Sequence, residues 1–178
     1  MDNFKIIAAV KNDEDFKLAI DSKVNTIFHL SSNVLKIKKQ ANLAHFSGKK
    51  LFIHVDFAEG IAKDLFGMKI LKMFGVDGII STNGKIIKYA KEEGLLTVQR
   101  FFIIDSRSID STVESVKQSK PNMIEIMPGV VTKVISRLKE NISIPIIAGG
   151  LIETCEEVEE ALELGIYKIS TGCKQLWN

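Results

Sequence analysis

The sequence lacks the features of a membrane protein, of a disulfide-bonded secreted domain and of a strongly charged chain. No run of 18 or more apolar residues occurs among the 178 residues, so no membrane-spanning helix is expected. The two cysteines, Cys155 and Cys173, are too few for a disulfide framework and lack Cys-x-x-Cys spacing. The first residues show no basic segment followed by a long apolar one. We therefore expect a cytoplasmic protein, and the net charge of +2 neither requires nor excludes a polyanionic partner.

Short apolar runs rich in β-branched residues recur through the whole chain. They cover residues 6–10, 26–30, 51–57, 78–82, 96–104, 123–128, 144–150 and 168–172. Such runs are typical of parallel strands buried on both faces. Amphipathic segments separate them, and Thr154 followed by Glu157 is typical of a capping box that opens one of these helices. Eight strands alternating with about seven helices predict a single domain over 1–178 with the α/β fold of a (β/α)8 TIM-type barrel; an open doubly wound sheet is the alternative.

The last unit of this barrel is incomplete. Such barrels usually take about 200–250 residues, and only the segment KQLWN follows the eighth run. The last helix is therefore expected to be short or missing, which leaves part of the apolar barrel wall uncovered. Leu176 and Trp177 either fold over that wall or meet a second subunit in a homodimer.

Two glycine-containing turns end the last two predicted strands. Gly149 and Gly150 follow one strand, and Ser170, Thr171 and Gly172 follow the other. In TIM-type barrels the loops after strands seven and eight often hold a phosphate group. Main-chain N–H groups at the start of a helix suit an anion. These five residues are therefore predicted to bind phosphate; the alternative is that each glycine only eases a tight turn.

Polar side chains near other strand ends complete a predicted pocket. The two-residue period of a strand places His54 and Asp56 on one face. It also turns Glu125 toward the barrel interior, because Ile124 and Ile126 face the helices. A buried carboxylate needs hydrogen-bonding or charged partners. We expect Asp56 and Glu125 to contact the polar part of a ligand.

Gln99 and Arg100 are adjacent and point to opposite sides of their strand. Gln99 shares a face with Thr97 and is expected to contact the ligand. Arg100 is either a cation at the rim near the ligand or a structural partner for a carboxylate such as Asp105. Glu59 is a further candidate at the rim for binding hydroxyl groups or a metal. No set of His, Asp and Glu residues has convincing ligand spacing, so neither a metal nor a cofactor is predicted.

No residue is assigned to catalysis. A barrel enzyme that forms an imine needs a lysine near the end of a strand, whereas Lys168 lies at the start of its strand. Asp56 and Glu125 fit two roles, an acid–base pair or two hydrogen-bond acceptors for a polyol phosphate.

Seven lysines lie on the helices predicted after strands two, three and four. They are Lys36, Lys38, Lys39, Lys69, Lys72, Lys85 and Lys88. Either they form a basic strip that contacts an RNA backbone, or they are the solvated faces of ordinary helices. The sequence has no aromatic RNA-recognition motif, KH loop or zinc knuckle.

Several segments together resemble one family. They are HVDFAEGIAKD, GIISTN, QRFFIIDS, IEIMPG, IPIIAGGLI and ISTGCKQLW. They are similar, over nearly the whole chain, to segments of the glycerol-3-phosphate-responsive antiterminators, which regulate glycerol-uptake operons in Gram-positive and related bacteria. The resemblance implies a barrel, not an enzyme, that binds sn-glycerol 3-phosphate and acts on the leader of its target messenger RNA to prevent early termination of transcription. The alternative is a small phosphosugar lyase or isomerase on the same scaffold.

The resemblance also bears on individual residues. The family motifs include Asp56, Glu59, Gln99, Arg100, Glu125, Gly149, Gly150, Ser170 and Thr171. Two positions depart from the family pattern. Asn83 stands where a basic residue usually follows GIIST, which removes a cation from the phosphate rim or from an RNA-binding surface. Gly172 stands where a small hydroxyl residue is common, but it keeps a main-chain N–H for a phosphate.

Overall fold

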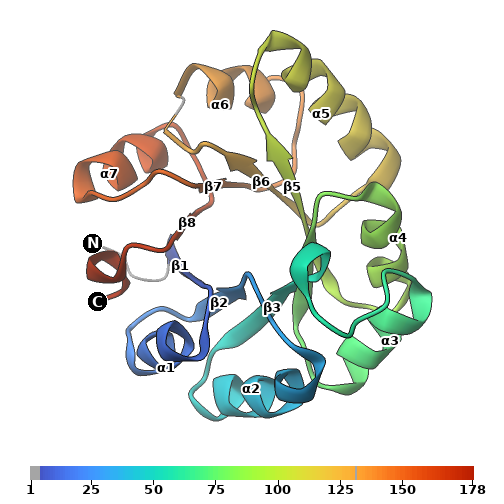
Figure 1. Cartoon of the computed structure of the whole chain (residues 1–178). Coiled ribbons are helices and arrows are strands. Elements are labelled where there is room, and N and C mark those ends of the chain that lie inside the picture. Colours follow the sequence, from blue (N-terminus) through green and yellow to red (C-terminus); the bar gives the residue numbers. More distant parts are fainter. Residues whose placement is uncertain (1–4, 131) are drawn as a thin grey trace.

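The computed structural model describes residues 5–130 and 132–178, which form a closed barrel of eight parallel strands surrounded by helices (Figure 1). The strands are β1 (Ile6–Val10), β2 (Thr26–His29), β3 (Lys50–His54), β4 (Gly78–Ser81), β5 (Leu96–Phe102), β6 (Met123–Met127), β7 (Ile146–Gly149) and β8 (Lys168–Thr171). Each strand pairs with the next along the chain, and β8 pairs with β1. The predicted barrel is confirmed, and the open sheet is excluded.

The α-helices cover the outside of the barrel (Figure 1). They are α1 (Asp13–Asp21), α2 (Val34–Phe46), α3 (Leu65–Met73), α4 (Gly84–Glu92), α5 (Ser106–Ser119), α6 (Thr132–Lys139) and α7 (Cys155–Glu163). The capping box predicted at Thr154 and Glu157 is confirmed at the start of α7. Asn83 caps α4, because its side chain accepts a hydrogen bond from the N–H of Lys85.

The barrel wall is apolar on both faces, as expected for parallel strands covered by helices. The cluster of side chains inside the barrel consists of Ile7, Phe28, Phe52, Ile80, Val98 and Ile147. A larger cluster lies between the strands and the helices and includes Ile124 and Ile126. None of the helices formed by the described residues is long and apolar enough to cross a membrane.

The chain closes with a short 3-10 helix, η3 (Lys174–Trp177), which lies between α7 and α1 (Figure 1). Leu176 and Trp177 are buried. The Nε1–H of Trp177 donates to the carbonyl oxygen of Thr171 at 3.0 Å, and the carbonyl oxygen of Trp177 accepts from the N–H of Lys23. The expected short last helix is confirmed. Leu176 and Trp177 fold over the wall of their own barrel, which removes the reason to expect a homodimer contact through them.

The third strand is shorter than predicted. It ends at His54, and Val55–Phe57 form a 3-10 turn, η2. The prediction that Asp56 shares a strand face with His54 is therefore wrong. The turn directs Asp56 toward the end of β4, where its carboxylate accepts hydrogen bonds from the hydroxyl groups of Ser81 and Thr82 and from the N–H of Thr82.

Candidate functional site

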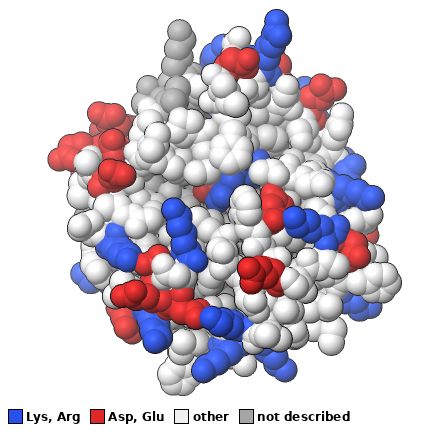
Figure 2. All heavy atoms as spheres, in the orientation of Figure 1, with Lys and Arg blue, Asp and Glu red and all other residues white. Residues whose placement is uncertain are grey.

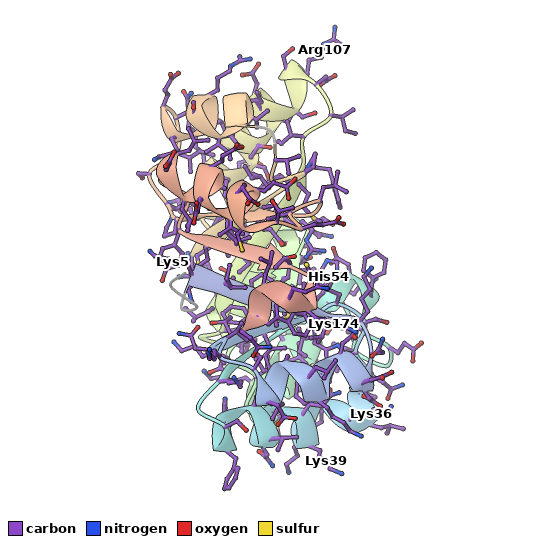
Figure 3. All side chains as sticks on the ribbon, turned by 90° about the vertical axis from the view of Figure 1, so that its left-hand side faces the viewer. Lys5, Lys36, Lys39, His54, Arg107 and Lys174 are labelled. Carbon is purple, nitrogen blue, oxygen red and sulfur yellow. The ribbon has the colours of Figure 1, made fainter. Side chains whose placement is uncertain are left out.

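A cavity of about 830 Å³, here called the β7–β8 cavity, opens where β7 and β8 end. Loops after β1, β2, β7 and β8 line it, together with side chains from β5 and β6. Its lining includes six of the predicted site residues, namely Arg100, Glu125, Gly150, Ser170, Thr171 and Gly172. It lies at the carboxyl ends of the strands, the end marked by His54 in Figure 3, whereas Lys5 precedes β1 and marks the opposite end.

A buried ion pair lies at this cavity. Arg100 Nε donates to Glu125 Oε2 at 2.6 Å, and the two residues are only 6% and 1% exposed. The strand register places them opposite each other across β5 and β6. Glu125 Oε1 is buried and has no hydrogen-bond partner among the described residues. This oxygen is thus a buried acceptor beside a cavity, ready for a donor from a ligand.

Arg100 is the partner of a carboxylate, as one of the two expectations had it, but the carboxylate is not that of Asp105. Arg100 pairs with Glu125, and Asp105 instead caps the start of α5. Gln99 points outward: its Nε2 donates to Ser115 and its Oε1 accepts from Ser119, both on α5. Gln99 therefore holds α5 on the barrel and is not brought to the cavity, contrary to the expectation that it contacts the ligand.

The two glycines after β7 have different roles. A Cβ at Gly149 would lie 2.5 Å from Glu125 Oε1, so the missing side chain makes room for the carboxylate. Gly150 has φ of +73°, a conformation that L side chains rarely adopt, and it lines the cavity. Only Gly150 of the pair is therefore placed where its main chain can meet a ligand.

The loops after β7 and β8 use some of their N–H groups internally. The carboxylate of Glu157 accepts from the N–H groups of Glu153 and Thr154, which directly precede α7, and the hydroxyl of Thr154 accepts from the N–H of Glu157. No hydrogen bond between described residues uses the N–H groups of Gly150, Leu151, Ile152 or Gly172, all of which line the cavity. These loop N–H groups are thus available to a phosphate at the cavity.

The hydroxyl of Thr171 is occupied by the protein itself. It donates to the carbonyl oxygen of Ile152 at 2.7 Å and accepts from the N–H of Cys173 at 3.0 Å, which ties the two loops together. Lys11 also lines the cavity and was missed from sequence. Lys11 directly follows β1, which pairs with β8. In a closed barrel the end of the first strand lies beside the segment ISTGC, and this could have placed Lys11 at the cavity.

A second cavity of about 430 Å³, here called the β3–β5 cavity, lies at the same end of the barrel. Its lining residues are His54, Asp56, Phe57, Lys63, Thr82, Asn83, Ile86 and Phe102. Burial raises the pKa of Asp56, but the nearby imidazole of His54 and the hydrogen bonds from Ser81 and Thr82 outweigh burial and hold that pKa well below its ordinary value. Asp56 is therefore ionised and anchors the loop after β4.

Glu59 lines neither of these cavities. Its Oε2 accepts a hydrogen bond from Asn33 Nδ2 at 2.9 Å, which joins the loops after β2 and β3. Among residues 5–130 and 132–178, no three His, Cys, Asp or Glu side chains are grouped closely enough to hold a metal ion.

The seven candidate lysines are exposed, and three of them make contacts within the chain. Lys36 forms an ion pair with Asp13, Lys72 donates to the carbonyl oxygen of Gly94, and Lys85 lies over the ring of Tyr89. Figure 2 shows basic and acidic side chains interspersed on the face viewed in Figure 1, with acidic groups gathered over α7. This face is therefore not uniformly basic.

Comparisons with known proteins agree over almost the entire chain. The family model described as glycerol-3-phosphate responsive antiterminator matches residues 6–177. The Escherichia coli (strain K12) protein YgcP, described as uncharacterized, is 38% identical over 97% of this chain and 91% of its own length.

Two solved structures are similar in both sequence and fold. The glycerol uptake operon antiterminator regulatory protein from Listeria monocytogenes is 32% identical, with a TM-score of 0.92 over 99% of this chain and 96% of that one. The glycerol uptake operon antiterminator-related protein from Thermotoga maritima is 31% identical, with a TM-score of 0.86 over 97% and 96%. Aldolase structures with 10–15% identity share the barrel and inform on the fold alone.

Proposed function

Because the chain belongs to the glycerol-3-phosphate responsive antiterminator family, we propose that it is a cytoplasmic regulator that binds sn-glycerol 3-phosphate in the β7–β8 cavity. In response, it acts on the leader of a glycerol-uptake messenger RNA and prevents early termination of transcription. It needs no cofactor for this role and catalyses no reaction.

The unpartnered oxygen of Glu125 carries the ligand assignment. A buried acceptor without a donor costs about 1–3 kcal/mol, and a ligand hydroxyl removes that cost by donating to Oε1. Arg100 holds the other oxygen of the carboxylate and so fixes its orientation. The glycerol end of the ligand therefore faces Arg100 and Glu125.

The phosphate end lies at the loops after β7 and β8. The N–H groups of Gly150, Leu151, Ile152 and Gly172 are the proposed donors, with Lys11 supplying a positive charge. Glu153 also lines this cavity, so its carboxylate has to stay on the solvent side of the loop. The close tie of Thr171 to Ile152 keeps the two loops in register for this contact.

The regulatory step requires two states of the protein. The ligand must bind the RNA-competent state more tightly, and each tenfold preference shifts the equilibrium by about 1.4 kcal/mol. Family membership supports RNA as the partner, and the exposed lysines of α2, α3 and α4 are the proposed phosphate-backbone contacts.

Thermal stability with sn-glycerol 3-phosphate tests the ligand, and phosphorus NMR tests turnover. Saturation at about 100 times the Kd should stabilise the protein by about 2.7 kcal/mol, with an unchanged ligand spectrum. Steady conversion of the ligand, or of another phosphosugar, would instead support a lyase or isomerase.

Gly150→Asp locates the phosphate. A carboxylate at this position repels the phosphate, so the ligand-induced rise in Tm should disappear. Gly48→Asp is the control for backbone strain, because Gly48 also has a positive φ, +69° against +73°. It lies in open space after α2, whereas a Cβ at Gly150 would also meet the end of the Met127 side chain at 2.8 Å. An unchanged ligand response in a folded Gly150→Asp protein would refute this placement.

A further inference from the structure

We propose that the β3–β5 cavity binds an unstacked base of single-stranded RNA. This inference rests on the proposed function, because it supplies a recognition site for the RNA partner. The cavity combines exposed aromatic walls, a buried polar group without a hydrogen-bond partner and a lysine at its rim. These are the groups that a base, its edge and its phosphates require.

The aromatic walls are Phe57 and Phe102. They come from different segments, the turn after β3 and the end of β5, and remain 66% and 56% exposed. The ring of Phe57 packs against the imidazole of His54, with 4.9 Å between ring centroids, which fixes its position. Large exposed aromatic rings that line a cavity offer the faces on which a base stacks.

The polar edge of the cavity is His54. Its side chain is 1% exposed, and Nδ1 has no hydrogen-bond partner among the described residues. Nε2 lies 3.6 Å from Asp56 Oδ2, beyond hydrogen-bond distance. The hydroxyl of Thr82 donates to Asp56, so its oxygen can still accept. A base edge carries both donors and acceptors and satisfies such groups.

One lysine of the lining, Lys63, is placed for a phosphate that flanks the base. Lys63 lines the cavity and donates through Nζ to the carbonyl oxygen of Asp56 at 2.8 Å. Lys85 lies in the first turn of α4, two residues after Asn83, which also lines the cavity. The β3–β5 cavity therefore lies at the start of α4, one of the helices that carry the candidate lysines. The negatively charged carboxylate of Asp56 already accepts hydrogen bonds from Ser81 and Thr82.

Strand β5 links this cavity to the β7–β8 cavity. Arg100 lines one cavity, and Phe102, two residues later on the same strand, lines the other. Phe102 also pairs in register with Met127, which lines the β7–β8 cavity. The two cavities therefore share strand β5, and the proposed coupling between ligand and RNA runs through this strand. Because coupling between two sites is reciprocal, RNA should in turn tighten binding of the ligand.

The test uses Phe102→Ala in the full chain and a pool of random-sequence 20-nucleotide RNAs in which 5-iodouridine replaces uridine. Removing the stacking ring should weaken RNA binding about tenfold and reduce photocrosslinking to the segment around Phe57. The slope of log affinity against log salt should stay unchanged, because the phosphate contacts remain. Lys63→Gln should lower that slope by about 0.7. Phe46→Ala is the matched control, since Phe46 is 91% exposed at the end of α2.

The outcomes separate this inference from the proposed function. If the wild-type protein binds the RNA pool but Phe102→Ala binds equally well, with crosslinks confined to α2 or α3, the base site is refuted and RNA binding stands. If the wild-type protein with sn-glycerol 3-phosphate binds no RNA, the base site and the RNA-binding part of the proposed function are both refuted. If Phe102→Ala abolishes self-association in sedimentation and leaves RNA binding intact, the aromatic walls contact a second copy, and the base site is again refuted.

Discussion

The buried ion pair between Arg100 and Glu125 should dominate the stability of the site. Glu125→Leu leaves the guanidinium of Arg100, only 6% exposed, without its carboxylate at 2.6 Å. Breaking such a pair from one side costs about 3–5 kcal/mol. Arg100→Met should cost a similar amount, because it strands the carboxylate. Either loss is a large part of the total stability of an ordinary domain, which is about 5–15 kcal/mol.

The double variant Arg100→Met with Glu125→Leu separates coupling from packing. Two apolar side chains in place of the pair leave no buried charge, so the double variant should be far more stable than the sum of the single losses predicts. Urea unfolding, followed by circular dichroism, would measure all four proteins. Additivity within about 0.5 kcal/mol would refute the reasoning, because independent sites add within that margin. The folded double variant should also lose the thermal response to sn-glycerol 3-phosphate.

Two further predictions concern pH and the closing helix. Burial, partly offset by Asp13, lowers the pKa of His29 to about 4, so the folded state favours the neutral imidazole. Since the pKa of an unfolded histidine is about 6.5, the stability from this residue is complete above that pH and is lost as the pH falls toward 4. His29→Leu should flatten the fall in urea midpoint over this window, and an unchanged fall would contradict the assignment. Trp177→Ala empties a site that is 1% exposed and should lower the free energy of unfolding by about 3–5 kcal/mol in the same assay. A loss below about 1 kcal/mol would show that η3 does not seal the wall.

The barrel could be predicted from the sequence alone. Parallel strands covered on both faces appear as apolar runs, which can be recognised without knowing which residues lie beside them. The start of α7 could also be predicted, since a capping box depends on residues only three positions apart. The end of β3 could not be predicted in this way. Its last apparent residues turn away because Asp56 accepts hydrogen bonds from Ser81 and Thr82, and no local pattern in HVDF reports those partners.

The site was predicted only in part for the same reason. The alternation of side chains along a strand predicted that Gln99 and Arg100 face opposite sides. Which of the two faces the barrel interior depends on the residues of the neighbouring strand and helix. The carboxylate opposite Arg100 and the serines of α5 opposite Gln99 make that choice. The role of Gly149 likewise depends on Glu125, a residue from a different strand.

The adjacency of Gln99 and Arg100 has a consequence for how the barrel assembles. If β5 joined β6 one residue out of step, every side chain on it would change sides. The guanidinium of Arg100 would then contact the serines of α5 and have no counter-ion, and the amide of Gln99 would contact Glu125. A barrel with this wrong register would thus bury a charge without a partner. The ion pair between Arg100 and Glu125 therefore favours the correct register of β5 and β6, in addition to its place at the cavity.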